Sequence, residues 1–385
     1  MGRICAVFGK SDVSGYRFKQ KVAAPIAKMG FMEAHQASTP AKAAHNKKSK
    51  APRKHHYVPV FYQRNFTNDA DLLWVYDRQR GTYKELHPLS ICFQKDLYAL
   101  KPDNKPMDMQ VETRILSAVD SFGSWGIRRF QVASPNNDAE EAVAVFAAFE
   151  WCRVPTISRD MRLTYAKGIE ELSRLTFANV ERAKAAMERY SRDTGEPIDV
   201  TPESMVEAVQ GKHLKIEATE VVFLANMMEQ AVGLANLLRQ LDWEVLVAAE
   251  DSGFIICDCP VVVVPPKGSR FVGFAIPGSA KYFPLSRHLC LRLGDPGRRR
   301  KHRNIDKEAV RIVNMNVAAN SERFIMGPSR LQLEHIVLRS GCATMEATPR
   351  FTVETVESDE DSSLQKLSAQ PRRYFYPKNG APYAP

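Results

Sequence analysis

The order of apolar and polar positions divides the chain into strands, then helices, then strands again. Residues 72–77 are rich in β-branched and aromatic side chains, which favours a strand. Residues 82–86 follow a turn at Gly81 and predict the second strand of a hairpin. Just before it, residues 60–66 predict a short helix, because Pro59 fits a first helical turn, where its missing N–H would have no partner.

The middle of the chain carries apolar residues three and four positions apart, which is the spacing of one buried helix face. Gly123 and Gly126 predict a break in the first helix of this block, and Asp138 predicts the N-cap of the second. Helices are predicted over residues 109–130, 138–152, 159–190 and 217–241.

The last third of the patterned region returns to short apolar runs that favour strands, followed by one helix capped by Asp306. Because strands lie on both sides of a helical block, we predict an α+β fold. It comprises an N-terminal β-hairpin region, a central helical block and a small C-terminal mixed sheet with a closing helix. Further strands are predicted at residues 97–100, 243–247, 254–257, 261–264, 282–285, 289–293 and 324–326, and the closing helix at 307–323.

Composition adds that this is a globular chain of 385 residues, with 44% hydrophobic and 25% charged residues. The longest apolar run, residues 142–149, is far shorter than the roughly 18 residues of a membrane helix, so no membrane segment is expected. The start of the sequence lacks the pattern of a secretory signal. The seven cysteines are scattered without a Cys-x-x-Cys pair, which fits reduced thiols. We therefore expect a soluble, cytoplasmic protein.

The formal charge of +10 is concentrated in two acid-free runs. Residues 41–56 carry six lysines and arginines, and residues 297–303 carry five, so the rest of the chain is close to neutral (10 − 6 − 5 = −1). Two such runs could bind nucleic acid by releasing counterions from its phosphates. A flexible solubilising tail and a solvated loop would explain them equally well.

One short segment has a distinctive composition. It reads His55-His56-Tyr57-Val58-Pro59-Val60-Phe61-Tyr62 and is followed by Arg64, Asn65 and Phe66. This motif resembles the opening signature of an uncharacterised, mostly bacterial family, domain of unknown function 4238. Counterparts of the family's later landmarks follow in order: residues 73–78, Arg153-Val154-Pro155, residues 254–261, residues 282–286, and Asn314 with Asn316.

The resemblance covers about residues 54–330 and implies that they form a single α+β domain. It carries no activity with it. Cys257 and Cys259 depart from the family pattern, which has Ser and Asn at these positions. Outside the resemblance, residues 1–53 are expected to form a disordered basic extension. Residues 331–385 are expected to form a poorly ordered tail, acidic at first and then proline-rich.

The histidines of the opening motif are the first candidates for chemistry. A neutral imidazole suits a general base near pH 7 or a transition metal, so His55 and His56 are candidate catalytic residues. On a regular strand their side chains would point to opposite faces, and only one would enter a given site. Capping and packing of the nearby helix is the alternative role for both.

The other candidate site residues are acids and arginines in apolar surroundings. Asp77 and Asp258 are candidate catalytic residues and, together with Glu112, candidate ligands of a divalent metal. Arg64 and Arg153 are candidate phosphate-binding residues, because a guanidinium can bind a phosphate through two hydrogen bonds. Structural pairing between these acids and arginines is the alternative.

Two hypotheses about function follow. The first is a nucleic-acid-associated protein with a metal-dependent, nuclease-like hydrolytic site around His55 and His56. The second is a non-enzymatic interaction module in which the His-His-Tyr segment and Asp258 form a structural polar network.

Overall fold

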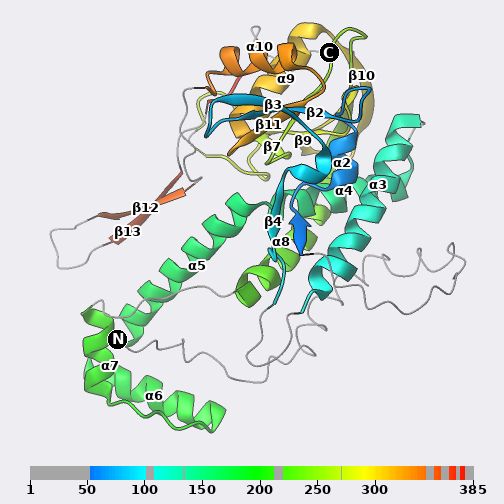
Figure 1. The fold of residues 1–385 in the computed structure, drawn as a ribbon. Helices are drawn as coiled ribbons and strands as arrows, with labels where there is room; N and C mark the ends of the chain where they lie inside the picture. Colours follow the sequence, from blue (N-terminus) through cyan, green and yellow to red (C-terminus); the bar gives the residue numbers. More distant parts are fainter. Residues whose placement is uncertain are drawn as a thin grey trace, which may run out of the picture. The chain divides into compact units, whose positions relative to one another are not determined.

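The computed structural model describes residues 53–100, 108–132, 135–211, 220–269, 271–343, 351–356, 364–369 and 373–377 (Figure 1). The fold is α+β, with the N-terminal hairpin, central helices and C-terminal mixed sheet that the sequence predicts. The chain divides into two compact units. One contains Ser158–Glu229, and the other contains His45–Ile157 and Gln230–Pro385. The second, larger unit holds both main sheets.

The first sheet of the larger unit is antiparallel and joins segments that lie far apart in the sequence. Its strand order is β3-β2-β11-β6. The hairpin has the predicted bounds within one residue, and Gly81 closes it with a positive φ of 64° that other residues rarely adopt. The four strands are β2 (Leu73–Asp77), β3 (Thr82–Leu86), β6 (Ile256–Cys257) and β11 (Phe324–Gly327).

The second sheet has the order β10-β5-β9-β8-β7. All neighbours pair antiparallel except β10 and β5, which are parallel. Residues 300–303 of the basic run therefore belong to an edge strand, whereas residues 297–299 form an exposed connection, so the interpretation of the run as a solvated loop holds only for its first three residues. The strands are β5 (Leu241–Ala248), β7 (Val262–Val264), β8 (Ala280–Pro284), β9 (Leu289–Pro296) and β10 (Arg300–Ile305).

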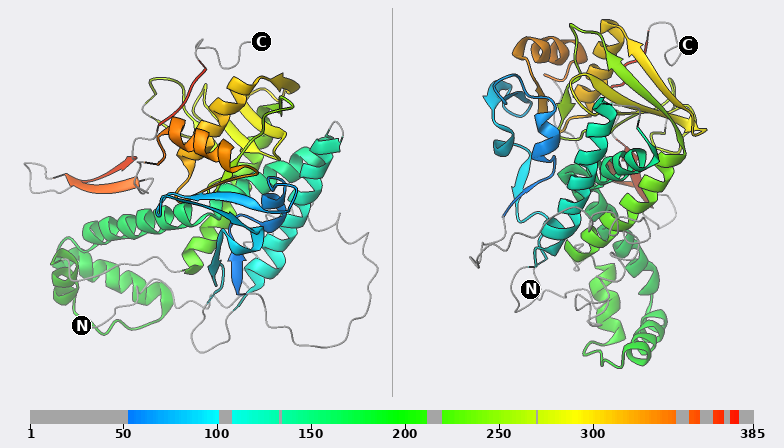
Figure 2. Two further views of the ribbon diagram at one scale, coloured as in Figure 1. Left: turned by 45° about the horizontal axis from the view of Figure 1, so that its top comes forward. Right: turned by 90° about the vertical axis from the view of Figure 1, so that its right-hand side faces the viewer.

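Helices α3 (Ser117–Val132) and α4 (Asn137–Cys152) pack closely, as both views of Figure 2 show. The predicted break at Gly123 and Gly126 is wrong. The helix continues through both glycines. A Cβ at either position would overlap side chains of α4, so the glycines are there because they let the two helices approach closely. The N-cap of α4 is Asn136 rather than Asp138. A π-helical stretch, Val111–Leu116, leads into α3.

The remaining helices of the larger unit lie near its two ends in sequence. Residues 331–385 were expected to form a poorly ordered tail, yet this region begins within an eleven-residue helix, α10. These helices are α2 (Val60–Arg64), α9 (Lys307–Asn320), capped by Asp306 as predicted, and α10 (Arg330–Ser340).

Two short strand pairs complete this unit. The opening motif contains β1 (Lys54–His56), which pairs with β4 (Phe93–Lys95). The strand predicted at residues 97–100 does not form, and only Leu100 makes an isolated bridge, to Asp108. The other pair is β12 (Phe351–Val356) with β13 (Leu364–Ala369).

The described residues between Ser158 and Glu229 are mainly helical. The helix predicted over residues 159–190 is instead two helices, because Asn179 caps a new one by accepting a hydrogen bond from the Arg182 N–H. A helix that sequence reasoning missed follows Thr201. The helices are α5 (Pro155–Thr176), α6 (Val180–Thr194), α7 (Pro202–Gln210) and α8 (Glu220–Gln240); α5 begins and α8 ends in the larger unit.

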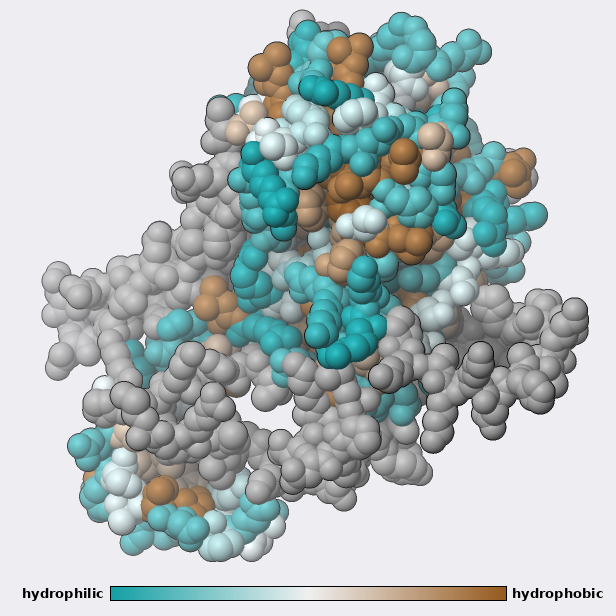
Figure 3. Space-filling view, viewed as in Figure 1, coloured by the Kyte–Doolittle hydropathy of each residue, from teal (hydrophilic) through white to brown (hydrophobic). Residues whose placement is uncertain are grey.

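The core of the larger unit is rich in aromatic residues around Tyr62, which is fully buried. Its ring stacks on Phe283 at 5.3 Å and meets Phe146 edge-on at 5.6 Å, and its hydroxyl donates to the Pro284 carbonyl. Hydrophilic residues predominate on the described face in Figure 3, interrupted by small apolar groups. None of the helices described in the structure is long and apolar enough to cross a membrane.

Candidate functional site

The seven candidate residues separate into two clusters and one isolated position, all in the larger unit. We call the first the Arg153 cluster; it contains His55, His56, Tyr98, Glu112, Asp120, Glu150 and Arg153. We call the second the Asp258 cluster; it contains Asp77, Asp258 and Arg323. Arg64 belongs to neither, since its exposed side chain pairs with Asp71 at 3.6 Å.

Arg153 is fully buried just beyond the end of α4. Its Nη1 donates to Asp120 Oδ1 at 2.8 Å, and its Nη2 donates to Glu150 Oε1 one helical turn earlier. Burial alone would lower the pKa of Arg153, but Asp120 and Glu150 raise it, so the guanidinium stays charged. Both terminal nitrogens already have carboxylate partners, which fits a structural pairing better than the predicted phosphate contact.

The carboxyl groups around Arg153 have perturbed acidities. Burial raises the pKa of Glu150 to about 8, against the opposing effect of the Arg153 charge. Burial likewise raises the pKa of Glu112, on the π-helical stretch before α3, to about 7. The pKa of Asp120 is also raised by burial, although Arg153 counteracts it. Near neutral pH, part of Glu112 is therefore protonated.

The two histidines take different positions, as strand geometry predicts. They are consecutive residues of β1 in regular pairing with β4, so their side chains point to opposite faces. His55 is buried, accepts the Tyr98 N–H at its Nδ1 over 3.0 Å and stacks on the Tyr98 ring. His56 is half-buried, and burial lowers its pKa, helped by the charges of Lys54 and Arg153, which favours the neutral ring at pH 7.

Three buried polar atoms of this cluster have no hydrogen-bond partner within the described part of the chain. They are His56 Nε2, Glu150 Oε2 and Arg153 Nε. Native proteins rarely bury such atoms without a structural or functional reason. Orphaned polar atoms together with raised carboxyl pKa values are typical of a site that handles protons.

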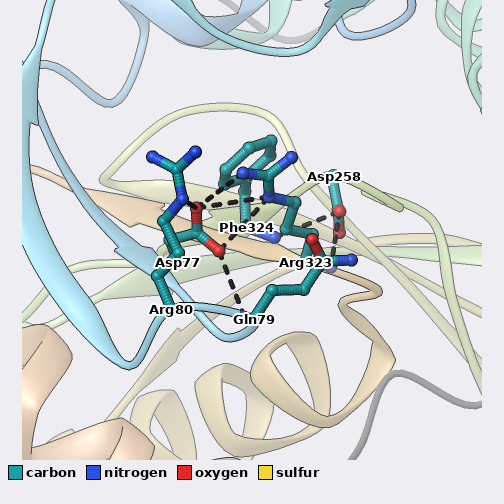
Figure 4. Close-up of polar contacts among 6 residues, drawn as sticks. All are labelled: Asp77, Gln79, Arg80, Asp258, Arg323 and Phe324. Atoms are coloured by element: carbon teal, nitrogen blue, oxygen red, sulfur yellow. Dashed lines mark hydrogen bonds and ion pairs between the residues drawn. The ribbon is translucent and has the colours of Figure 1, made fainter.

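In the Asp258 cluster, one carboxylate organises the turn before β11 (Figure 4). Asp258 accepts the backbone N–H groups of Glu322, Arg323 and Phe324 at 2.9, 2.7 and 3.1 Å. Burial raises the pKa of Asp258 to about 6, although these three hydrogen bonds favour the charged form.

Asp77, at the end of β2, lies on the other side of Arg323. It accepts Arg323 Nη2 at 2.8 Å and the Gln79 N–H at 3.1 Å. Burial would raise its pKa, but the hydrogen bonds from Arg323 outweigh this and lower it. The two acids thus share one arginine and the turn that carries it.

These contacts bear on the predicted metal ligands Asp77, Asp258 and Glu112. No group of three or more His, Cys, Asp or Glu side chains in the described ranges is arranged to hold a metal ion. The oxygens of Asp77 and Asp258 accept N–H groups, and Glu112 belongs to the other cluster. The structure therefore does not bring the three acids together.

Most of the second basic run is neutralised by ion pairs. Arg299 pairs with Asp242 at 2.9 Å, Arg300 with Glu140 at 2.8 Å and Arg303 with Glu244 at 3.2 Å. Arg298 and Lys301 are exposed. Of the first basic run, only residues 53–56 fall within the described ranges.

Sequence reasoning missed Glu150, Asp120, Tyr98 and Arg323. A signal for Glu150 was present, since it lies in the most apolar segment of the chain, where a charge needs a partner. Its spacing from Arg153, one helical turn, supplies that partner.

The fold and its buried ionisable cluster define an α+β protein with two main β-sheets and a charged network in its core. More specifically, the chain belongs to the family of proteins of unknown function DUF4238, whose model matches residues 54–330. This is the family that the opening motif indicates. No curated protein and no solved structure matches the chain.

Proposed function

We propose that the protein is a nucleic-acid-associated hydrolase that transfers protons at the Arg153 cluster. One observation carries the proposal: ionisable groups with pKa values of about 7 and about 8 surround a buried arginine, with orphaned polar atoms on three members of the cluster. General acid–base catalysis near neutral pH needs groups of this acidity.

Glu112 and His56 are the proposed proton-transfer residues, because both side chains are only half-buried, whereas Glu150 and Arg153 are fully buried. The His56 ring hydrogen-bonds to the Leu89 backbone, and its Nε2 is the nitrogen without a partner. In the neutral ring Nε2 can accept the proton of an attacking water, while the protonated form of Glu112 gives its proton to the leaving group. The buried pair of Arg153 and Glu150 holds the cluster together.

The sequence-based version of this hypothesis assigned a divalent cation to Asp77 and Asp258. The hydrogen bonds that these carboxylates accept support a structural role for both, so the acid–base step is proposed at the other cluster. A cation that joins the reaction would need to displace Arg323 or the backbone N–H groups. The rate of hydrolysis should therefore be measured both with and without a divalent cation.

Association with nucleic acid is supported by the two basic runs, although three arginines of the second are ion-paired. Exposed Arg298 and Lys301 and the run at residues 41–56 would supply the affinity. Such binding weakens steeply with salt, because it depends on counterion release.

The test uses the full chain with single-stranded DNA, duplex DNA, RNA and simple carboxylic esters, each with Mg²⁺, with Mn²⁺ and with a chelator. Glu112→Gln should lower the rate by about 100-fold or more, with the Tm retained. Exposed Glu207→Gln is the matched control and should leave the rate unchanged. Lack of hydrolysis of every substrate, or full activity of Glu112→Gln, would reject the proposal. Activity that needs Mg²⁺ and is lost in Asp77→Asn instead would favour the metal site.

A non-enzymatic interaction module is the second candidate, and one observation favours it. Asp258 and His55 both accept backbone N–H groups, which is how side chains order a core. In that case His56→Ala lowers the Tm and removes no separable activity, and Glu112→Gln changes neither hydrolysis nor nucleic-acid binding.

A further inference from the structure

A short aromatic segment near the C-terminus lies against α9 and the end of β7. It comprises residues 373–377, Arg-Tyr-Phe-Tyr-Pro, and we call it the C-terminal segment. Phe375 N–H donates to Asn316 Oδ1 at 3.0 Å, and Asn316 Nδ2 donates to the Phe375 carbonyl at 2.9 Å. Tyr376 hydroxyl donates to the Pro265 carbonyl at 3.0 Å. The backbone of Phe375 and the side chain of Tyr376 therefore both hold the segment.

Asn316 recognises the backbone of the segment rather than a particular side chain. Its carboxamide bonds both main-chain groups of Phe375, as the facing residue of an antiparallel strand does. Asn316 is only 2% exposed, and its side chain also donates a hydrogen bond to the Ile312 carbonyl in its own helix. A buried carboxamide is costly unless its donors and acceptor are satisfied, and the segment satisfies them.

Selectivity comes from the residues that flank Phe375. Only a tyrosine at position 376 presents a hydroxyl donor to the Pro265 carbonyl at this reach. Pro377 favours an extended backbone at Tyr376, because a residue before proline avoids helical dihedral angles. The backbone of Tyr376 therefore loses less conformational entropy when the segment binds.

We propose that Asn316 and Pro265 form a peptide-binding site whose ligand is an extended aromatic-Tyr-Pro segment. The C-terminal segment of the same chain occupies it. This binding site is independent of the proposed hydrolase, and no covalent step is involved. The bound segment ties residues 373–377 to α9.

Hydrogen–deuterium exchange on the full chain tests the site directly. The amide of Phe375 should exchange more slowly in the wild type than in an unstructured peptide. Asn316→Ala should accelerate its exchange by about 10- to 100-fold, the equivalent of one or two lost hydrogen bonds. Asn320→Ala is the matched control, since Asn320 is also buried on α9 but bonds Cys259 and Val261 carbonyls. It should lower the Tm and leave this protection intact.

A peptide of residues 372–378 separates recognition from general stability. In full-length Phe375→Pro the segment loses the N–H that Asn316 accepts, so the site becomes available to a labelled peptide. The peptide should bind this variant at least tenfold more tightly than it binds wild type, and a Tyr376→Phe peptide should bind more weakly. The proposal would be overturned if the peptide bound wild type and Phe375→Pro equally, or bound neither of them. It would also be overturned if the amide protection of the wild type were lost on dilution, because that would indicate that the segment binds another copy of the protein.

Discussion

Substituting alanine for Gly126 tests the close packing of α3 against α4. In a helix, Gly→Ala gains about 1 kcal/mol, because alanine loses less backbone entropy on folding. Here the new Cβ would lie 2.7 Å from Ala142 Cβ and 3.1 Å from the Ala139 carbonyl oxygen. Overpacking of this kind costs about 1–3 kcal/mol, and a backbone neighbour favours the upper end of that range. The net expectation is a loss of about 2 kcal/mol in the free energy of unfolding.

Urea denaturation followed by circular dichroism measures this difference, with Gly233→Ala as the control. Gly233 lies in α8, and a Cβ there meets nothing within 4 Å, so the control should be stabilised by about 1 kcal/mol. Adding Ala142→Gly to Gly126→Ala removes the nearest contact and should give a favourable coupling energy of about 1 kcal/mol. If Gly126→Ala is as stabilising as Gly233→Ala, or if no coupling appears, the packing described between α3 and α4 is wrong.

Three further predictions concern buried polar groups. The pKa of Glu112 is raised from 4.5 to about 7, so the free energy of unfolding contains a contribution from this group that is complete below pH 4.5 and is lost as pH rises to 7. In Glu112→Gln the free energy of unfolding, measured from pH 4.5 to 7, should therefore fall less steeply than in the wild type. Tyr62→Phe removes a buried hydrogen bond of 2.6 Å to the Pro284 carbonyl and should cost about 1 kcal/mol in chemical denaturation, whereas an unchanged midpoint would contradict that bond. Arg323→Met removes the donors that lower the pKa of Asp77, so an NMR titration should find that pKa raised, and an unshifted titration would show that the pair is unimportant.

The hairpin, most later strands and the closing helix could be predicted because their signals are local. Gly81 and the β-branched residues around it specify the hairpin over a few positions, and Asp306 caps α9 within one turn. Local signals also misled at Gly123, where packing against Phe146 explains the glycine and helix propensity does not. The strand at residues 300–303 of the basic run could not be predicted, because it depends on pairing with β5 and on ion pairs with distant acids such as Glu140.

The candidate site shows a sharper limit. Sequence reasoning selected Arg153 and Glu112 separately but assigned Glu112 to a metal with Asp77 and Asp258. Which acid meets which arginine depends on the packing of α3 against α4 and on the pairing of β11 with β2, and both are long-range contacts. The opposite orientations of His55 and His56 could be predicted, because they depend only on strand geometry.

The central position of β11 has a consequence for synthesis of the protein. β2 and β3 leave the ribosome early, but the strand that pairs with β2 is made about 250 residues later, since Asp77 lies opposite Phe324. At a translation rate of roughly 5–20 residues per second, one edge of β2 stays unpaired for on the order of ten seconds or more before β11 is synthesised. An unpaired strand edge invites pairing with other chains. A nascent chain of this protein should therefore bind chaperones until β11 emerges, and shortening the chain before Phe324 should make it aggregate.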